Sequence, residues 1–186
     1  MAEYLRYVIK TKEPIRISDD SMSQSGQTET LRYIPGTTIR GLVINALAKE
    51  NDFEQIKEVL FSKDINYLNA YPIIGERELI PSPKGFYEDK KVVEGKKEIQ
   101  NVVINGKFTE GHKRAGLGRY CHIEDDCIYY YNVDTGSDMK IKINLDEDEK
   151  QPVFRNEYMM PGQFFCGYIR VNNEALKERI QKVYLV

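Results

Sequence analysis

The sequence of 186 residues contains no tryptophan, only two histidines and only three cysteines. The cysteines are Cys121, Cys127 and Cys166, and because none forms a Cys-x-x-Cys pair the sequence predicts no structural zinc site. Their odd number argues against the disulfide framework of a small secreted protein. The sequence lacks a signal-peptide pattern, and no stretch approaches the roughly 18 apolar residues of a membrane span. We therefore expect a soluble, cytoplasmic protein with no membrane partner.

Motifs for nucleotide cofactors and metal ions are missing as well. Gly111 and Gly116 have the spacing of a P-loop, but Leu117 follows where that motif needs lysine. Gly116 and Gly118 alone are too short for a dinucleotide-binding fingerprint. The acidic run at residues 146–149 lacks the ligand spacing of an EF-hand, so we interpret it as a solvated turn. The sequence thus predicts neither a cofactor nor a metal ion.

The composition is apolar enough for a folded core, and it is rich in tyrosine. Apolar residues make up 41% of the chain, and 13 residues are tyrosines. Tyrosine is common at half-buried strand positions, and it also offers a stacking face for nucleic-acid bases. Both interpretations remain open at the level of sequence.

Charge is unevenly distributed, although the net charge is only −2. Residues 84–119 hold nine Lys or Arg and five Asp or Glu, whereas residues 124–150 hold nine acidic residues and three lysines. A basic stretch in a nearly neutral chain can follow the phosphates of a nucleic acid. The alternative is a solvated surface of mixed sign.

Residues 33–42 predict a turn that leads into an amphipathic helix. Pro35 and Gly36 favour the turn, and Thr37 or Thr38 can cap the helix by accepting from its free N–H groups. The helix is expected over residues 38–49, since apolar residues recur there with helical spacing. They are Ile39, Leu42, Val43, Ala46 and Leu47.

Two residues in this helix are not explained by packing. Arg40 falls in the first turn, where the helix dipole disfavours a cation, and Gly41 costs about 1 kcal/mol relative to alanine. A phosphate held over the helix N-terminus would account for both, because Arg40 would bind it and Gly41 would let it come close. The alternative is an ordinary turn and helix with an exposed arginine.

The order of expected elements indicates an α+β fold of the ferredoxin-like, RRM-like βαββαβ type in a single domain over residues 1–186. The framework elements are a strand at 4–10, the helix at 38–49, a short helix after Asp52, strands at 65–74 and 163–171, and a last helix capped by Asn172 or Asn173. A β-rich insertion is expected at about 75–160. Within it we predict a strand at 102–104 and a strand pair at 128–133 and 139–143 around a turn at Gly136.

Three segments resemble one protein family. Ile34-Pro35-Gly36-Thr37-Thr38-Ile39-Arg40-Gly41 resembles the IPGSSLKG or IPGSALRG signature of the RAMP superfamily, the repeat-associated proteins of CRISPR effector complexes. In that family the signature opens the first helix of a ferredoxin-like domain. Residues 68–72 with 81–85, and the Pro-Gly-Gln strand at 157–169, resemble the large RAMP subunit of type III-D complexes. Together these segments span most of the chain.

The resemblance implies a non-catalytic subunit of a type III effector complex for antiviral defence, similar to the N-terminal half of that large subunit. Its partners would be guide RNA (crRNA) and other RAMP subunits. Thr37, Thr38 and Arg40 would contact phosphate. A second contact would come from a glycine-rich basic stretch that can cradle phosphate with its backbone. Its residues are Lys113, Arg114, Gly116, Gly118 and Arg119.

Two alternatives remain at the level of sequence. An endoribonuclease is one, because Asp19 and Asp20 fall in the loop where the repeated RAMP subunit of type III complexes carries an aspartate that helps to cleave RNA. Asp20 is the single catalytic candidate of that kind, and His112 or His122 could instead deprotonate a ribose hydroxyl. The other alternative is a ferredoxin-like domain whose tyrosine-rich sheet docks a protein.

Overall fold

The computed structural model describes residues 2–18, 27–49, 53–90, 99–106, 110–124, 127–141 and 153–182. It divides into two compact units. The first unit comprises Met1–Glu78 and Val133–Val186, and the second comprises Leu79–Asn132. The first unit is therefore built from both ends of the chain. A single domain with an insertion at about 75–160 stays a prediction.

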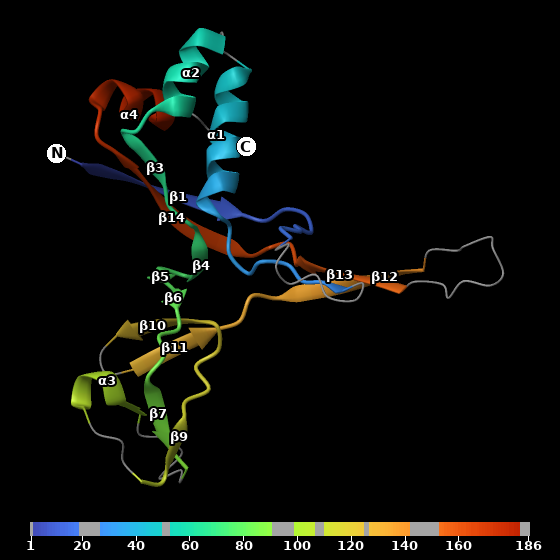
Figure 1. Cartoon of the computed structure of the whole chain (residues 1–186), viewed down its shortest axis with the longest axis vertical. Coiled ribbons are helices and arrows are strands. Elements are labelled where there is room, and N and C mark those ends of the chain that lie inside the picture. Colours follow the sequence, from blue (N-terminus) through green and yellow to red (C-terminus); the bar gives the residue numbers. More distant parts are fainter. Residues whose placement is uncertain are drawn as a thin grey trace. The chain divides into compact units, whose positions relative to one another are not determined.

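The first unit is organised around an antiparallel sheet of five strands. The strands are β1 (Glu3–Lys10), β3 (Ile65–Tyr67), β4 (Tyr71–Ile74), β5 (Arg77–Glu78) and β14 (Phe164–Val171). β14 lies in the centre, with β1 along one edge and both β3 and β4 along the other (Figure 1). The strand expected at 65–74 is thus two short strands that pair with the same neighbour.

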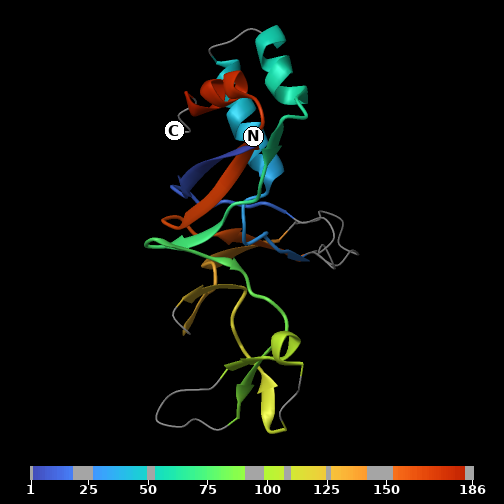
Figure 2. The same cartoon turned by 90° about the vertical axis from the view of Figure 1, so that its left-hand side faces the viewer.

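Two helices, α1 (Gly36–Ala48) and α4 (Glu174–Gln181), pack on one face of this sheet, and α2 (Phe53–Phe61) packs beside α1 (Figure 2). The core lies between the layers, where apolar residues of α1 and β14 are almost fully buried. They are Ile39, Val43 and Leu47 of α1 and Phe165, Ile169 and Val171 of β14. With β14 between β1 and β3/β4, the strand order is that of a ferredoxin-like fold, so the predicted fold class is confirmed.

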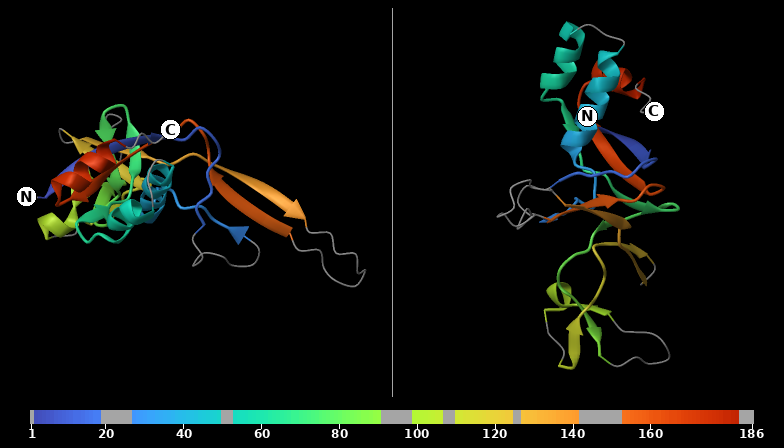
Figure 3. Two further views of the ribbon diagram at one scale, coloured as in Figure 1. Left: turned by 90° about the horizontal axis from the view of Figure 1, so that it is seen from above. Right: turned by 90° about the vertical axis from the view of Figure 1, so that its right-hand side faces the viewer.

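A two-stranded arm of the first unit extends away from this sheet (Figure 3). It consists of β12 (Thr135–Ile141) and β13 (Val153–Met159), and β2 (Gln27–Thr28) runs parallel to β13. The base of the arm is held by Arg32, whose Nη2 lies 2.7 Å from Oε1 of Glu157. Both side chains are largely buried, so this ion pair is shielded from water.

The predicted pairing of residues 128–133 with 139–143 is wrong. β11 (Cys127–Tyr131) pairs with β10 (Tyr120–Glu124), and β12 pairs with β13. Gly136, which we expected to form the turn, lies inside β12 opposite Tyr158. A Cβ atom there would approach the ring of Tyr158 to 2.6 Å. The glycine therefore makes room for an aromatic ring across the ladder.

The second unit contains two sheets of three strands each. One is formed by β6 (Ile80–Pro81), β10 and β11, and the other by β7 (Phe86–Asp89), β8 (Ile99–Asn101) and β9 (His112–Arg114). Both sheets are antiparallel. The glycine-rich basic stretch singled out in the sequence leads from β9 to β10.

The strand predicted at 102–104 is instead a single helical turn, α3 (Val102–Asn105). Asn101 causes the difference, because its side-chain oxygen accepts hydrogen bonds from the backbone N–H groups of Val103 and Ile104. Gly106 ends the turn in the left-handed conformation, with φ of 66°. A capping side chain and a terminal glycine thus override the strand preference of three β-branched residues.

A buried glutamine joins three parts of the first unit. Gln163 directly precedes β14, and only 8% of it is exposed. Its Nε2 donates to the carbonyl oxygens of Asp134 (3.0 Å) and Met160 (2.7 Å), while its Oε1 accepts from the N–H of Asp134 (2.8 Å). Its backbone is bonded in both directions to Thr11, just beyond β1. Gln163 thus ties together the end of β1, the start of β14 and the approach to β12.

Replacing Gln163 with leucine should destabilise the protein by about 2 kcal/mol, because the N–H of Asp134 would lose its partner and the carbonyl oxygens of Asp134 and Met160 would each lose one of two donors. Urea or guanidinium unfolding of the variant measures this loss. Gln181→Leu, at an exposed position in α4, is the matched control and should stay within about 0.5 kcal/mol of the parent protein. Equal stability of the two variants would contradict the role given to Gln163.

Candidate nucleic-acid interface

The start of α1 differs from the sequence prediction. The helix begins at Gly36, so Thr37 and Thr38 lie inside its first turn, and the expected threonine cap is wrong. Pro35 occupies the N-cap position and makes no side-chain hydrogen bond. The N–H of Gly36 donates instead to Oδ1 of Asn69 at 2.9 Å. A side chain from the loop between β3 and β4 therefore satisfies one of the helix's first N–H groups.

Gly36 is required by the close approach of two backbones. A Cβ atom on Gly36 would lie 2.0 Å from the carbonyl oxygen of Tyr67 in β3. Gly41 is different, since a Cβ atom there would meet nothing within 4 Å. Packing therefore explains why residue 36 is glycine, whereas it does not explain the glycine at position 41.

Arg40 has a structural partner that the sequence did not reveal. Its Nη2 donates to the carbonyl oxygen of Leu60, one residue before the end of α2. The last carbonyls of a helix lack partners within the helix and carry partial negative charge, so a guanidinium group is favourable there. Arg40 therefore stabilises the end of α2, although it lies at the unfavourable end of its own helix. This bond uses one of the five N–H donors of the guanidinium group.

A cavity of about 390 Å³ opens beside Arg40. Its wall is formed by the first turn of α1, by the end of α2 and Ser62 directly after it, and by β3. The lining residues are Gly36, Thr37, Arg40, Val59, Leu60, Phe61, Ser62, Ile65, Asn66 and Tyr67. Thr37, on the exposed side of the helix, and Arg40 thus meet at one cavity, whereas Thr38 is not part of its wall.

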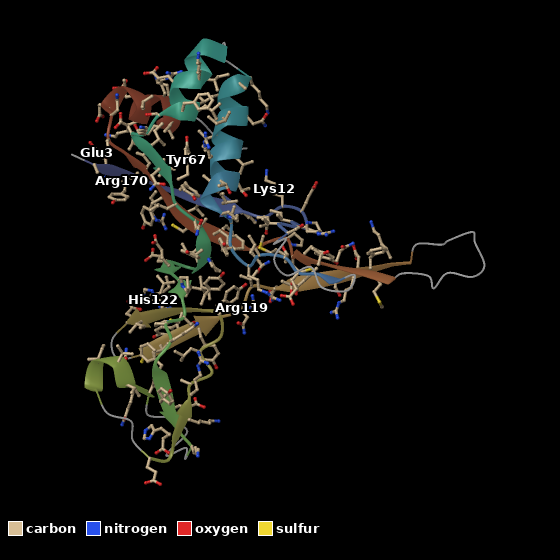
Figure 4. All side chains as sticks on the ribbon, in the orientation of Figure 1. Glu3, Lys12, Tyr67, Arg119, His122 and Arg170 are labelled. Atoms are coloured by element: carbon tan, nitrogen blue, oxygen red, sulfur yellow. The ribbon has the colours of Figure 1, made fainter. Side chains whose placement is uncertain are left out.

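Tyr67 contributes an unsatisfied polar atom beside this cavity. Its side chain lies between β3 and α1 (Figure 4). Its hydroxyl group is buried and has no hydrogen-bond partner among the described residues. Burial raises the pKa of Tyr67 to about 12, so the hydroxyl keeps its proton at neutral pH and can donate. The hydroxyl group is therefore a donor that the described residues leave unsatisfied.

The second predicted contact belongs to the second unit. Lys113 and Arg114 are exposed on β9, and Lys113 Nζ lies 3.2 Å from Oε1 of Glu88 on the neighbouring strand. Gly116, also exposed, follows in the loop, where a Cβ atom would meet nothing within 4 Å. Arg119 is exposed directly before β10. The stretch therefore presents cations to solvent, one of them already paired.

Gly118 shapes the end of this stretch. It adopts φ of +66°, and a Cβ atom there would lie 3.0 Å from Oδ1 of Asn132. The same oxygen accepts from the N–H of Arg119 at 3.1 Å. The backbone N–H of Arg119 is therefore already bonded, so a phosphate could use its side chain but not this amide. The phosphate cradle proposed for this stretch stays a prediction.

Of the residues named for the nuclease alternative, the structure describes only the two histidines. Asp19 and Asp20 lie outside the described residues. Both ring nitrogens of His112 are buried, and no described residue hydrogen-bonds to them. Nε2 of His122 lies 4.0 Å from Oε2 of Glu124 on the same strand. Within the described ranges, no three His, Cys, Asp or Glu side chains are placed to hold a metal ion.

No protein-family model matches the chain, and no curated protein does either. A solved structure, however, contains a chain of similar fold. It is the cryo-EM structure of the Type III-B Cmr-beta bound to cognate target RNA. The TM-score is 0.51 at 12% sequence identity, and the match covers 98% of this chain and 51% of that chain.

At this identity the likeness concerns the fold. It agrees with the ferredoxin-like fold that the RAMP resemblance implies, and it does not distinguish one RAMP subfamily from another. This protein spans about half the length of the chain it matches. None of the helices in the described part of the chain combines the length and apolar character needed to cross a bilayer.

The two glycines at the start of α1 should respond differently to alanine. Gly36→Ala should destabilise the protein by about 2 kcal/mol, because the added Cβ forces α1 away from β3. Gly41→Ala should stabilise it by up to about 1 kcal/mol, since alanine is the better helix former and the site is open. Denaturant unfolding of both variants tests this contrast, and a Gly36→Ala protein as stable as the parent would contradict it.

Proposed function

We propose that the protein is a non-catalytic, guide-RNA-binding subunit of a type III CRISPR effector complex, with guide RNA and other RAMP subunits as partners. The three sequence segments that resemble RAMP proteins support the family. The likeness in fold to a chain of the Type III-B Cmr-beta bound to cognate target RNA supports the type of complex. The resemblance to the large subunit of type III-D complexes makes the guide, with its repeat-derived handle, the RNA that we favour.

The observation that carries the proposal is the cavity beside α1. It brings together the side chains of Thr37 and Arg40, and it lies next to the enclosed hydroxyl of Tyr67. A phosphate in this cavity would accept from the guanidinium group, and the hydroxyl of Tyr67 would donate to it once the ring turns toward the cavity. The first turn of α1 adds the favourable end of the helix dipole. An RNA phosphate is therefore the ligand that fits the donors present.

The second unit would supply a separate phosphate contact. Arg114 and Arg119 are exposed, and Gly116 between them has open space beside it. The Glu88 carboxylate already pairs with Lys113, so we expect Lys113 to contribute less than either arginine. Contacts of this kind hold the backbone of a nucleic acid and carry no sequence information.

Tyr67→Phe removes only the enclosed hydroxyl and is the sharpest test of the cavity. The variant should be at least as stable as the parent protein, because the lost group has no hydrogen-bond partner among the residues that the structure describes. Its affinity for guide RNA should fall about tenfold, the loss expected for one hydrogen bond to a charged group. Fluorescence anisotropy with labelled guide RNA measures the affinity. Tyr33→Phe, outside the cavity wall, is the control, and equal affinities of the two variants would argue against a phosphate at Tyr67.

Arg40→Ala should weaken RNA binding and reduce the salt dependence of binding by about one unit of slope, since one phosphate contact is lost. It should also cost some stability, because the carbonyl of Leu60 loses its donor. The slope of log affinity against log salt concentration separates the lost phosphate contact from the lost stability, since a purely structural role of Arg40 leaves this slope unchanged. Arg16→Ala removes one charge at an exposed position outside the cavity wall and serves as the control for net charge.

A further inference from the structure

The sheet of the first unit has a second face, opposite the helices, with a regular pattern along β1 and β14. On this face each aromatic residue stands across the ladder from a cation. The pairs are Tyr4 with Arg170, Tyr168 with Arg6, and Phe164 with Lys10. The alternate residues of β14, which face the helices, are buried. The pattern is therefore a property of one face and does not involve the core.

The rings at the two ends of this pattern are accessible. Tyr4 is 58% exposed and Phe164 is 45% exposed. Nζ of Lys10 lies 5.3 Å from the centre of the Phe164 ring, within range of a cation–π interaction. Arg170 is exposed at the opposite end of the ladder, near Glu3 (Figure 4). An aromatic surface and a positive charge thus stand next to each other at both ends.

A cavity of about 610 Å³ lies against the Phe164 end of this face. β1 contributes Arg6 and Val8 to its wall, and the turn between β4 and β5 contributes Gly75 and Glu76. Gly75 has φ of 60°, and a Cβ atom there would meet nothing within 4 Å, so the turn leaves the cavity open on that side. The cavity therefore offers an aromatic ring, an apolar wall and polar groups at its margin.

At the centre of this face the charged groups pair with one another, whereas the cations at its two ends form no ion pair with a described residue. Glu78 accepts hydrogen bonds from Arg6 Nε (2.6 Å) and from the hydroxyl of Tyr168 (2.7 Å). The bond from Arg6, followed by that from Tyr168, holds the pKa of Glu78 below its ordinary value, so the centre keeps its ion pair at neutral pH. Among the described residues, neither Lys10 nor Arg170 forms an ion pair.

We propose that this face binds an unpaired RNA strand, with bases stacked on Phe164 and Tyr4 and phosphates held by Lys10 and Arg170. Aromatic rings beside cations are the features that recognise single-stranded nucleic acid, because every base has a face that can stack. A purely apolar partner would leave the two cations without partners, which favours a polyanion over an apolar protein segment. This inference rests on the proposed function and adds that the protein contacts unpaired bases at a second site.

The test compares an unpaired RNA strand with an abasic strand of the same length, which keeps the phosphates and lacks the bases. The protein should bind the unpaired strand more tightly than the abasic one. Phe164→Leu and Tyr4→Leu should each weaken binding to the unpaired strand about tenfold, the loss expected for one base–aromatic stack, and should leave the abasic strand unaffected. Phe154→Leu changes another exposed phenylalanine, 40% exposed on β13, and is the matched control.

The outcomes separate this inference from the proposed function. If the parent protein binds both strands equally, or if Phe164→Leu binds the unpaired strand as the parent does, base stacking on this face is overturned. Phosphate binding beside Arg40 would then still stand, and the face would be available to a protein partner. If neither strand binds, both the proposed function and this inference fail. Phe164→Tyr keeps the ring, so recovery of binding in that variant would assign the effect to the ring and not to a change in folding.

Discussion

The hydrogen bonds around Gln163 hold the first unit together, because they join segments that are far apart in the chain. The side-chain amide bonds to both the N–H and the carbonyl of Asp134, much as a neighbouring strand would. Its backbone bonds to Thr11 where β1 ends, which fixes the register of β1 against β14. The residues of the sheet that face the helices and those that face solvent are set by that register. The open face formed by β1 and β14 therefore depends on this junction.

The two surfaces use the two sides of the same sheet. On the helix side, Gly36 lets α1 approach β3 closely, and the cavity with Arg40 and Tyr67 results from that approach. On the other side, the ladder of β1 and β14 presents rings next to cations. One surface offers hydrogen-bond donors for a phosphate, and the other offers stacking faces for bases. A strand of RNA presents both chemistries at every nucleotide, so the two surfaces suit one ligand.

The fold class was predictable from the sequence because it depends on periodicity, which the helix after Pro35 and the strand after Gln163 both show clearly. The partners of individual polar residues were not predictable, because they lie on other elements. Arg40 bonds to a carbonyl of α2, and Gly36 is required by the backbone of Tyr67. The turn at Val102–Asn105 was missed because the cap at Asn101 outweighs strand propensity. Sequence patterns reveal which face of an element is apolar, whereas tertiary contacts decide which polar group is left without a partner.

The most direct test of the account is the binding of the purified chain to a guide RNA with its repeat handle and to an unrelated RNA of the same length. Binding is measured at two salt concentrations, and the products are run on a denaturing gel. The account predicts tighter binding to the guide with its handle, loss of affinity as salt rises, and intact RNA on the gel. Absence of binding to either RNA would contradict the account, and cleavage of the RNA would contradict a non-catalytic role.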